Sequence, residues 1–345
     1  MSEKQERSVK MENKKSCFEC GTKDNYELKD TIRVYEGDGY DFELWVNIPF
    51  CKNCGAPIYD EELENEIAQR ANKKIREQRG IITREGILEI LESYNVSQKF
   101  LSKLLGWGEI TLTRYISGNY TPNITNSNRL KELKNPYVFQ DLLYRYSEKQ
   151  ISDSEEKLLK KVQSQVSNKI DKMSEDQGRI ISVVNWFLAQ SSEETPVTHL
   201  ALQKLLYFTQ GWSMVLSGKE MFDDDCQAWA HGAVYPKVYE LFKRFKYMPL
   251  PKIYQIAVFD EKDLNILTMV KQYYFDVYSA KALEEICHKE EPYRKAREGC
   301  RDGEICNAVI NKKNIALYYD RISREYDIGF SSMVNVKKYL NLILG

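Results

Sequence analysis

Two Cys-x-x-Cys pairs stand near the start of the chain, and they constrain its folding more than any other feature of the sequence does. Cys17 and Cys20 form the first pair, and Cys51 and Cys54 form the second. The two-residue spacing lets a tight knuckle direct both thiolates of a pair at one tetrahedral ion. Four sulfur ligands leave no position for water. We therefore expect one structural Zn²⁺, bound by these four cysteines.

The span between the pairs has the composition of a β-hairpin. Thr31 to Tyr35 and Phe42 to Ile48 are strand-like, and Gly37-Asp38-Gly39 can turn the chain between them. Two alternatives are four buried free cysteines and a redox Cys-x-x-Cys. The repeated spacing disfavours the first, and the lack of a βαβ pattern disfavours the second. The stretch resembles the N-terminal zinc-binding domain of MqsA-like antitoxins, but only in its metal ligands.

Short helical patterns follow from residue 83. Ser97 can cap a helix that buries Phe100 and Leu104, Gly106 supplies a turn, and Glu109 to Ser117 is the candidate recognition helix. At least one apolar side chain of that helix is expected to be exposed, because its apolar residues do not share one face.

This order resembles the Xre/Cro-like helix-turn-helix family, whose motif is matched by Gln98, Gly106, Arg114 and Gly118. The resemblance implies DNA binding, in which some residues contact phosphates and others meet base edges. The implied phosphate contacts are Gln98 and Asn119, and the implied base contacts are Glu109, Thr111, Thr113 and Arg114.

Charge makes DNA binding by a single copy weak. The chain has 50 Lys and Arg against 51 Asp and Glu, a formal net charge of −1. Between Val96 and Pro122 the bases are Lys99, Lys103 and Arg114, against the acid Glu109. We therefore expect a homodimer on a palindromic operator. A helix pair without a DNA role is the alternative.

Two further helices are expected beside this segment. Asp60 can cap a helix running to about Arg79, whose apolar stripe would pack on the following domain or on a second copy. Ser152 to Met173 reads as a helical linker or dimer seam. The first stripe is Leu63, Ile67, Ala71 and Ile75, and the second is Leu158, Val162, Val166 and Ile170.

The stretch from Leu202 to Lys246 dominates the C-terminal part of the chain. It begins as an apolar helix, breaks into a turn rich in acids and aromatics, and resumes as a helix at Pro236. Such a turn is either a packed corner or a protein-binding surface. LQKLLYF, Ala228-Trp229 and the later HKEEPYRKAREGC resemble the Panacea domain, also called the SocA-like antitoxin domain, over about 176–345.

The resemblance implies a toxin-neutralising module. We place its toxin contacts on the aromatic turn, where the acids would steer a basic partner. Gly232-Ala233-Val234 and Tyr293 depart from the family's usual Gly-Pro-Val and Trp, which bears on local packing. The expected toxin-binding residues are Phe222, Asp223, Asp224, Asp225, Trp229, Tyr235 and Tyr239.

Other classes of protein fit the sequence less well. The chain lacks a phosphate-binding glycine loop, a Gly-x-Ser-x-Gly motif and a His-Glu-x-x-His motif, so an enzyme is not indicated. No secretory signal or membrane-length apolar run is present, and we expect a cytoplasmic protein. His199, His231 and His288 lie near four further cysteines, but their spacings match no standard metal knuckle.

The sequence thus predicts a mainly α, multidomain fold with a small β-hairpin zinc finger, a helix-turn-helix domain and a mostly α-helical (α+β) Panacea-like domain. The expected function is that of a type II antitoxin, which binds a cognate protein toxin and operator DNA. A zinc-containing regulator with a ligand-sensing C-terminal domain is the alternative, and a phage-associated enzyme is more distant. The boundaries are 1–15 for a flexible tail, 16–58 for zinc binding, 59–82 for a linker helix, 83–150 for DNA binding, 151–174 for a helical linker and 175–345 for toxin neutralisation.

Overall fold

The computed structural model describes residues 15–37, 40–118, 120–149, 151–254, 257–301 and 303–345. The expected flexible tail and the turn residues Asp38 and Gly39 fall outside these residues, apart from Lys15. The described chain divides into two compact units. The first unit comes from Met1–Ile90 and Ile110–Glu132, and the second from Leu91–Glu109 and Leu133–Gly345. The segment predicted as the DNA-binding domain contributes to both units.

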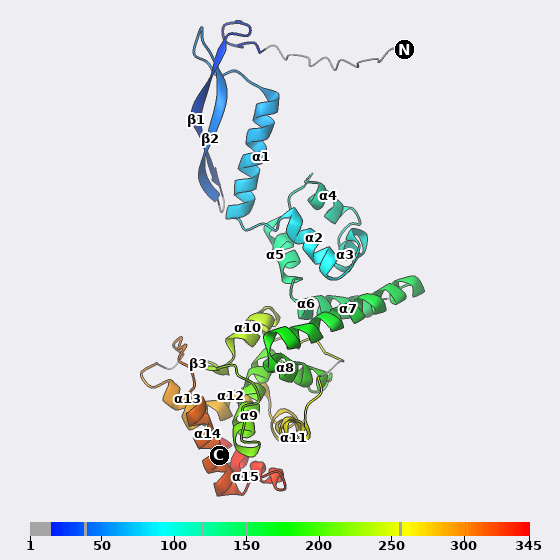
Figure 1. The fold of residues 1–345 in the computed structure, drawn as a ribbon, viewed down its shortest axis with the longest axis vertical. Helices are drawn as coiled ribbons and strands as arrows, with labels where there is room; N and C mark the ends of the chain where they lie inside the picture. Colours follow the sequence, from blue (N-terminus) through cyan, green and yellow to red (C-terminus); the bar gives the residue numbers. More distant parts are fainter. Residues whose placement is uncertain (1–14, 38–39, 119, 150, 255–256, 302) are drawn as a thin grey trace, which may run out of the picture. The chain divides into compact units, whose positions relative to one another are not determined.

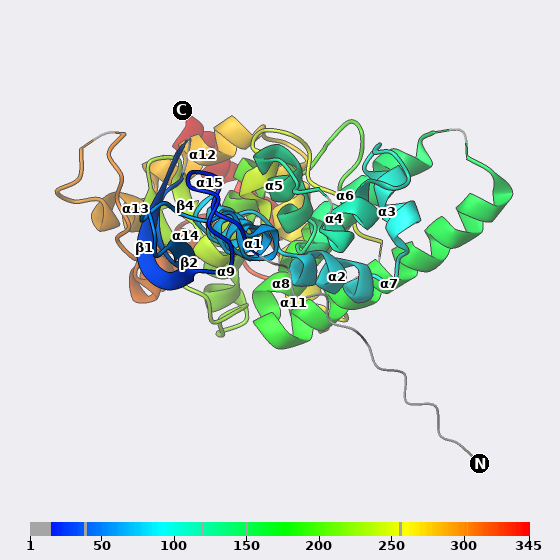
Figure 2. The ribbon, with the colours of Figure 1, turned by 90° about the horizontal axis from the view of Figure 1, so that it is seen from above.

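The first unit begins with a β-hairpin covered by one helix. Strands β1 (Tyr26–Gly37) and β2 (Tyr40–Cys51) pair antiparallel, with Tyr26 opposite Cys51. Helix α1 (Glu61–Gln78) lies along one side of the hairpin (Figure 1). Figure 2 shows the same arrangement viewed nearly down the axis of α1. The predicted cap is confirmed, since the Asp60 carboxylate accepts from the Leu63 amide at 3.1 Å. The predicted hairpin is therefore confirmed, with longer strands than the sequence indicated.

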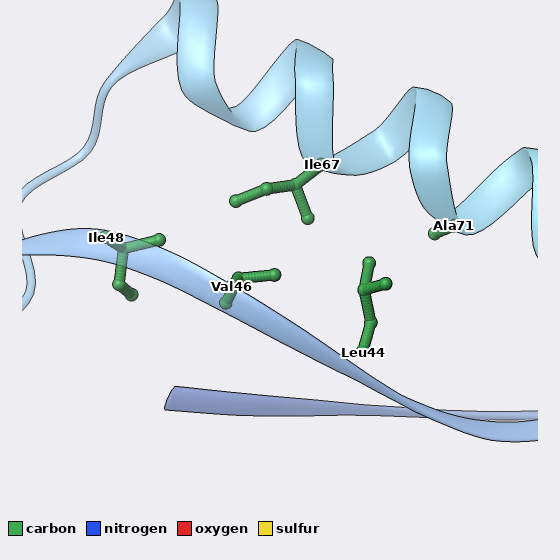
Figure 3. Close-up of a cluster of buried hydrophobic side chains, with 5 residues drawn as sticks. All are labelled: Leu44, Val46, Ile48, Ile67 and Ala71. Atoms are coloured by element: carbon green, nitrogen blue, oxygen red, sulfur yellow. The ribbon is translucent and has the colours of Figure 1, made fainter. Parts of the chain in front are cut away.

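The stripe of α1 packs on this hairpin rather than on a following domain. Alternate residues of β2 turn one face toward the helix, and Ile67 and Ala71 meet them (Figure 3). Arg33 of β1 donates two hydrogen bonds of 2.6 Å to the Glu64 carboxylate of α1. Because the hairpin covers Ile67 and Ala71, this part of the stripe is not available to a second copy. The buried cluster is Leu44, Val46, Ile48, Ile67 and Ala71.

Short helices continue the chain. The Ser97 hydroxyl accepts from the Phe100 amide at 3.1 Å, which confirms the predicted cap, and Gly106 has a φ of +71°. The candidate recognition helix begins two residues later than expected, at Thr111, and the exposed apolar side chain at its start is Ile110. The elements are α2 (Arg84–Ser93), α3 (Gln98–Leu104), α4 (Thr111–Ser117) and α5 (Ile124–Glu132).

Helices α6 (Pro136–Ser147) and α7 (Asp153–Gln177) are packed parts of the second unit. Helix α7 packs against α6 and against α8 (Arg179–Ala189). Its buried stripe is Leu159, Val162, Val166 and Ile170, whereas the predicted Leu158 is 38% exposed. The Tyr137 hydroxyl of α6 donates to the Asn185 side chain of α8 at 2.7 Å. The stripe that we interpreted as a linker or dimer seam is therefore covered within the chain.

Helix α9 (His199–Leu216) lies at the centre of the remaining helices. Helices α8, α11, α12 and α14 pack against it, and nearly every side chain from its start to Ser213 is buried. A short hairpin of β3 (Gln227–Trp229) and β4 (Gly232–Val234) also packs on α9. The other elements are α10 (Pro236–Phe242), η1 (Lys243–Phe245), α11 (Glu261–Val270), η2 (Lys271–Phe275), α12 (Ala280–Lys289), α13 (Glu291–Ala296), α14 (Lys312–Tyr326), η3 (Met333–Asn335) and α15 (Val336–Leu344).

The fold is mostly helical, with a small antiparallel hairpin near the N-terminus and a helical C-terminal domain, as the sequence predicts. None of the described helices combines the length and the apolar composition that crossing a bilayer requires.

Candidate metal centre and partner-binding pocket

The four cysteines predicted as metal ligands lie together in the first unit. Their sulfur atoms all lie within 4.8 Å of one another. The Sγ atoms of Cys17 and Cys54 are 3.5 Å apart, and those of Cys20 and Cys51 are 3.6 Å apart. A tetrahedral ion with Zn–S bonds of about 2.3 Å separates its ligands by about 3.8 Å. The cluster is therefore a possible metal site, and its size and ligand type fit zinc.

The same turn forms each half of this centre. The Gly21 amide donates to the Cys17 carbonyl at 2.9 Å, and the Gly55 amide donates to the Cys51 carbonyl at 2.8 Å. Both glycines have positive φ, +71° and +77°, a conformation that a side chain would strain. Two matching turns from distant parts of the chain thus direct their thiols at one point.

The centre has a buried side and an exposed side. Cys17 and Cys51 are 2% exposed and pack with Ile58, whereas Cys20 and Cys54 are exposed. A hydrogen bond with the Thr22 hydroxyl, at 3.2 Å, lowers the pKa of the Cys20 thiol to about 5.

The residues implied in base contact lie at or near α4. Thr113 and Arg114 are exposed and Thr111 is half-buried, while Asn119 lies outside the described residues. The Arg114 guanidinium stands over the Tyr120 ring, 5.2 Å from its centroid. The free protein therefore holds Arg114 against an aromatic ring, a favourable cation–π arrangement that base contact would have to replace.

The basic residues of α3 are engaged within the second unit. Lys99 pairs with the exposed Glu109 at 2.9 Å, and Lys103 pairs with Glu155 at the start of α7. Half-buried Gln98 opens α3 beside them. These ion pairs reduce the positive charge that α3 can offer to DNA. The segment therefore presents even less free positive charge than its few basic residues indicate.

In the C-terminal domain, polar side chains of α9 fix the aromatic turn through its backbone. Gln203 accepts from the Tyr235 amide at 2.7 Å, and Lys204 donates to the Ala233 carbonyl at 2.8 Å. Gln210 accepts from the Met221 amide at 3.0 Å and donates to the Phe222 carbonyl at 2.9 Å. All three side chains are buried. The turn is therefore a packed corner whose backbone is satisfied by a buried helix.

The motif HKEEPYRKAREGC holds the same hairpin from another side. The Tyr293 hydroxyl donates to the Trp229 carbonyl, and Arg297 donates to the Ala228 carbonyl, each at 2.8 Å. Two stretches that the sequence analysis singled out separately thus act on one structural element, the β3–β4 hairpin.

A largely apolar pocket of about 640 Å³ opens beside this hairpin. It is lined by the start of α9, the hairpin, α10, the segment after η1 and residues 305–307. Trp229 and Tyr239 line it, with ring centroids 4.8 Å apart in an edge-to-face contact. Tyr247 and Ile305, also in the lining, are 82% and 86% exposed. Volume and lining both suit a binding site.

The expected toxin-binding aromatics separate into two groups. Trp229 and Tyr239 are half-buried at the pocket, whereas Phe222 and Tyr235 are 2% and 1% exposed. The Phe222 and Tyr235 rings contact each other edge to face at 5.2 Å. These two aromatics belong to the core of the domain, so a partner in this folded state meets only the first group.

The acids beside the turn are mostly paired within the domain. Asp224 pairs with Lys237 at 2.6 Å, and Asp225 pairs with Lys312 at 3.4 Å. Lys312 also donates to the Asp223 carbonyl at 2.6 Å. These contacts of Asp223, Asp224 and Asp225 connect the turn to α10 and α14. The two lysines also reduce the negative charge that the three acids present to a partner.

Two ionisable groups at the pocket are shifted by burial. Burial lowers the pKa of His199 to about 4, so this histidine is neutral near pH 7. Burial also lowers the pKa of Lys204 to about 8. Within the described lining the pocket has lysines and histidines but no carboxylate.

A buried acid lies deeper in the same domain. Glu290 is fully buried and accepts hydrogen bonds from Tyr339 at 2.7 Å and Tyr319 at 3.1 Å. Burial raises its pKa to about 7, although the tyrosine hydroxyls oppose the shift. Tyr319 lies against α9, where the ring would be 2.6 Å from a Cβ atom added at Gly211.

Part of the C-terminal domain resembles known antitoxins. Residues 202–294 match the family model Antitoxin SocA-like, Panacea domain. Antitoxin SocA of Caulobacter vibrioides (strain NA1000 / CB15N) is 39% identical over 62 residues, which are 18% of this chain and 33% of that relative. The similarity thus spans about a third of the length of this curated relative. No solved structure matches the chain.

The match locates the Panacea-like segment on the structure. It begins in α9 and ends in α13, so it contains the hairpin, Gln203, Lys204, Tyr293 and most of the pocket lining. The match and the relative support an antitoxin. The Panacea match does not extend to the cysteine cluster or to α2–α5.

Several residues of this site were not identified from the sequence. The signal that could have identified Gln203, Lys204 and Gln210 is their polarity, since they lie inside an otherwise apolar helix. Glu290 and Arg297 lie in a motif that we quoted but did not interpret by residue. Their partners lie elsewhere in the fold, so sequence spacing could not reveal them.

Proposed function

We propose that this protein is the antitoxin of a type II toxin–antitoxin system, and that its C-terminal domain binds and blocks a cognate protein toxin. The observation that carries the proposal is the coincidence of the Panacea match with the apolar pocket beside the β3–β4 hairpin. In this proposal the protein acts by steric block and has no enzymatic activity.

The proposed toxin surface centres on the exposed side of that pocket. Trp229 and Tyr239 are rigid aromatic rings held in mutual contact, and Tyr247 and Ile305 stand exposed at the same pocket. Aromatic anchors near a pocket contribute most of the energy in many protein interfaces. Asp223, Asp224 and Asp225 remain part of the proposed surface as flanking charges.

The N-terminal part supplies autoregulation in this proposal. The four cysteines bind one structural Zn²⁺, which would fix the ends of the hairpin, and a homodimer represses its own operon through the segment 83–150. The support is the size of the thiol cluster, the Ser97 cap with the Gly106 turn, and exposed Thr113 and Arg114 on α4.

A regulator with a ligand-sensing C-terminal domain is the second candidate. The observation that favours it is the pocket volume of about 640 Å³, within the range of about 300–1,000 Å³ that is usual for small-molecule sites. A sensor would bind a small molecule there and change its DNA affinity, whereas an antitoxin would bind a neighbouring gene product.

Growth and binding assays separate the two candidates. We expect a short open reading frame beside the gene to stop growth when expressed alone, and the full-length protein to bind its product. Tyr247→Ala with Ile305→Ala should weaken that binding by about 2 kcal/mol or more, the usual size of a hot-spot loss. The matched control is Val258→Ala, since Val258 is 99% exposed and lies outside the pocket lining. An adjacent product without toxicity or binding would contradict the proposal.

The DNA-binding part has its own test. Arg114→Ala should lower discrimination between the operator and unrelated duplex by about 1–3 kcal/mol, as expected for a lost base contact. Footprinting of the region upstream of the gene measures this. An unchanged footprint would show that α4 does not read the bases.

A further inference from the structure

Basic residues from outside the helix-turn-helix motif flank the end of the candidate recognition helix. A pocket of about 320 Å³ in the first unit is lined by Arg76 of α1, by Ile82, Arg84 and Ile87 in and before α2, and by the C-terminal end of α4. Ser117, Gly118 and Tyr120 contribute the α4 side. No carboxylate occurs in the described lining, so the pocket is positive.

Both arginines have donors left for a ligand. Arg76 donates from Nη2 to the Thr121 hydroxyl at 2.7 Å, and its buried Nε atom has no hydrogen-bond partner. Arg84 is exposed and has no hydrogen bond or ion pair within the described part of the chain. The adjacent Glu85 is engaged mainly with its own amide and with Thr83, and it also feels the charges of Arg84 and Lys73. A buried donor without a partner is costly unless a ligand or water satisfies it.

The ligand that suits two such arginines is a phosphate oxygen group. Guanidinium groups bind phosphate through paired N–H donors and remain charged at any physiological pH. Hydroxyls such as those of Ser117 and Tyr120 are also frequent phosphate donors in protein–DNA complexes. At 320 Å³ the pocket is at the small end of the range of ligand sites, which suits one phosphodiester group better than a larger molecule.

The position of the pocket fits a duplex read by α4. This helix has seven residues, which makes it about 10 Å long, and the major groove is about 12 Å wide. A helix nearly as long as the groove is wide can bring one of its ends close to the phosphates on one border of the groove. Ser117 and Gly118 lie at such an end, and the two arginines stand beside them.

We infer that the pocket between Arg76, Arg84 and the C-terminal end of α4 is a subsite for a backbone phosphate of duplex DNA. The inference rests on the DNA-binding function proposed above. The subsite would add two positive charges to a chain whose Lys99 and Lys103 are paired with acids. The two arginines would set the strength and position of binding, whereas Arg114 would select the sequence.

Salt dependence of DNA binding tests the subsite. The full-length protein is titrated with duplex from the region upstream of its own gene and with a scrambled duplex of equal length, between about 50 and 200 mM salt. Each lost phosphate contact reduces the slope of log K against log salt by about 0.9, so Arg84→Gln should reduce it by about 1.8 in a dimer. Affinity for both duplexes should fall by the same factor.

Matched variants make the result specific. Lys73→Gln removes one charge from an exposed position on α1 outside the pocket, and its slope should change less than that of Arg84→Gln. Arg84→Lys should keep most of the slope. Arg76→Gln with Arg84→Gln should show the largest reduction, with thermal unfolding as the check on folding. An unchanged slope in folded Arg84→Gln would overturn the subsite, whereas a wild-type protein without affinity for either duplex would overturn the DNA-binding function itself.

Discussion

In the N-terminal hairpin, two turns from distant parts of the chain converge through four cysteines, whereas in the C-terminal domain one long turn is fixed by three polar side chains of α9. A small apolar cluster of Cys17, Cys51 and Ile58, with Tyr26 and Ala56 packed on it, lies at the ends of the hairpin. The hairpin beside the Panacea-like pocket rests on a helix that is buried along most of its length. The first region has four thiols placed as for a metal ion, whereas the second is held by its own buried side chains.

This difference determines where each region is sensitive. Two strands with one helix form a marginal structure, so any bound ion contributes a large part of the stability of the first region. In the second region the free energy is spread over many buried side chains, and single changes act by disturbing packing or buried polar groups. Four experiments would test this comparison.

Loss of the metal should have the largest effect. Cys51→Ser, or treatment with a strong chelator, should unfold the N-terminal hairpin and leave the C-terminal helices intact, because structural zinc sites contribute on the order of 10 kcal/mol. Limited proteolysis and elemental analysis measure this. Cys300→Ser, outside the cluster, is the control. Protein purified without chelator and found free of zinc would break the comparison.

Glu290 should give the C-terminal domain a pH dependence of its own. Its folded pKa of about 7 lies above the ordinary 4.5, so the folded state holds a proton that the unfolded state releases. Stability is therefore fully present below about pH 4.5 and is lost as pH rises toward 7. At 1.36 kcal/mol per pKa unit the change is on the order of 3 kcal/mol.

Glu290→Gln should remove this component from the pH profile of unfolding, measured by denaturant titration from pH 4 to 8. His199 contributes in the opposite direction, since its lowered pKa makes stability fall as pH drops from about 6.5 toward 4. The difference between wild type and variant isolates Glu290. Parallel profiles for the two proteins would show that the carboxyl is not buried as described.

Gly211→Ala should destabilise the same domain by about 1–3 kcal/mol, because its Cβ would lie 2.6 Å from the Tyr319 ring and force the ring to move. The melting temperature of the helical signal measures the loss. Gly329→Ala is the control, since its nearest contact would be 3.6 Å away. Equal effects of the two substitutions would mean that α9 is packed less tightly than this structure has it.

The acidic run should give the smallest effect. Changing Asp223, Asp224 and Asp225 to Asn removes charges that would steer a basic toxin, but Lys237 and Lys312 already pair with two of them. We expect a reduction of the on-rate by a few-fold at low salt and little change of the off-rate. Stopped-flow binding measures both rates. A folded variant with an unchanged on-rate would place the steering charges elsewhere.

Local patterns predicted the local structure well. The caps at Asp60 and Ser97, the paired knuckles and the helix opening at Pro236 all depend on residues within a few positions of one another. Period alone was less reliable in α7, where neighbouring Leu158 and Leu159 fit almost the same stripe and only the packing of α6 and α8 decides between them.

Long-range polar contacts could not be predicted in this way. Lys204 meets a carbonyl 29 positions away, and Tyr293 meets one 64 positions away. The aromatic turn was likewise divided by the fold, which buries Phe222 and Tyr235 and leaves Trp229 and Tyr239 at the pocket. The aromatic and acidic composition of the turn indicated a functional region, but only the tertiary structure shows which of its aromatic residues are buried and which are exposed.

The unequal exposure of the four cysteines has a kinetic consequence. Cys20 and Cys54 face solvent, while Cys17 and Cys51 lie against Ile58. A competing chelator would therefore reach an ion held there through the two outer sulfurs, and the inner pair would be released last. Exchange of the ion would then proceed in ordered steps, and its rate would depend on the motion of two exposed knuckle residues more than on the overall affinity.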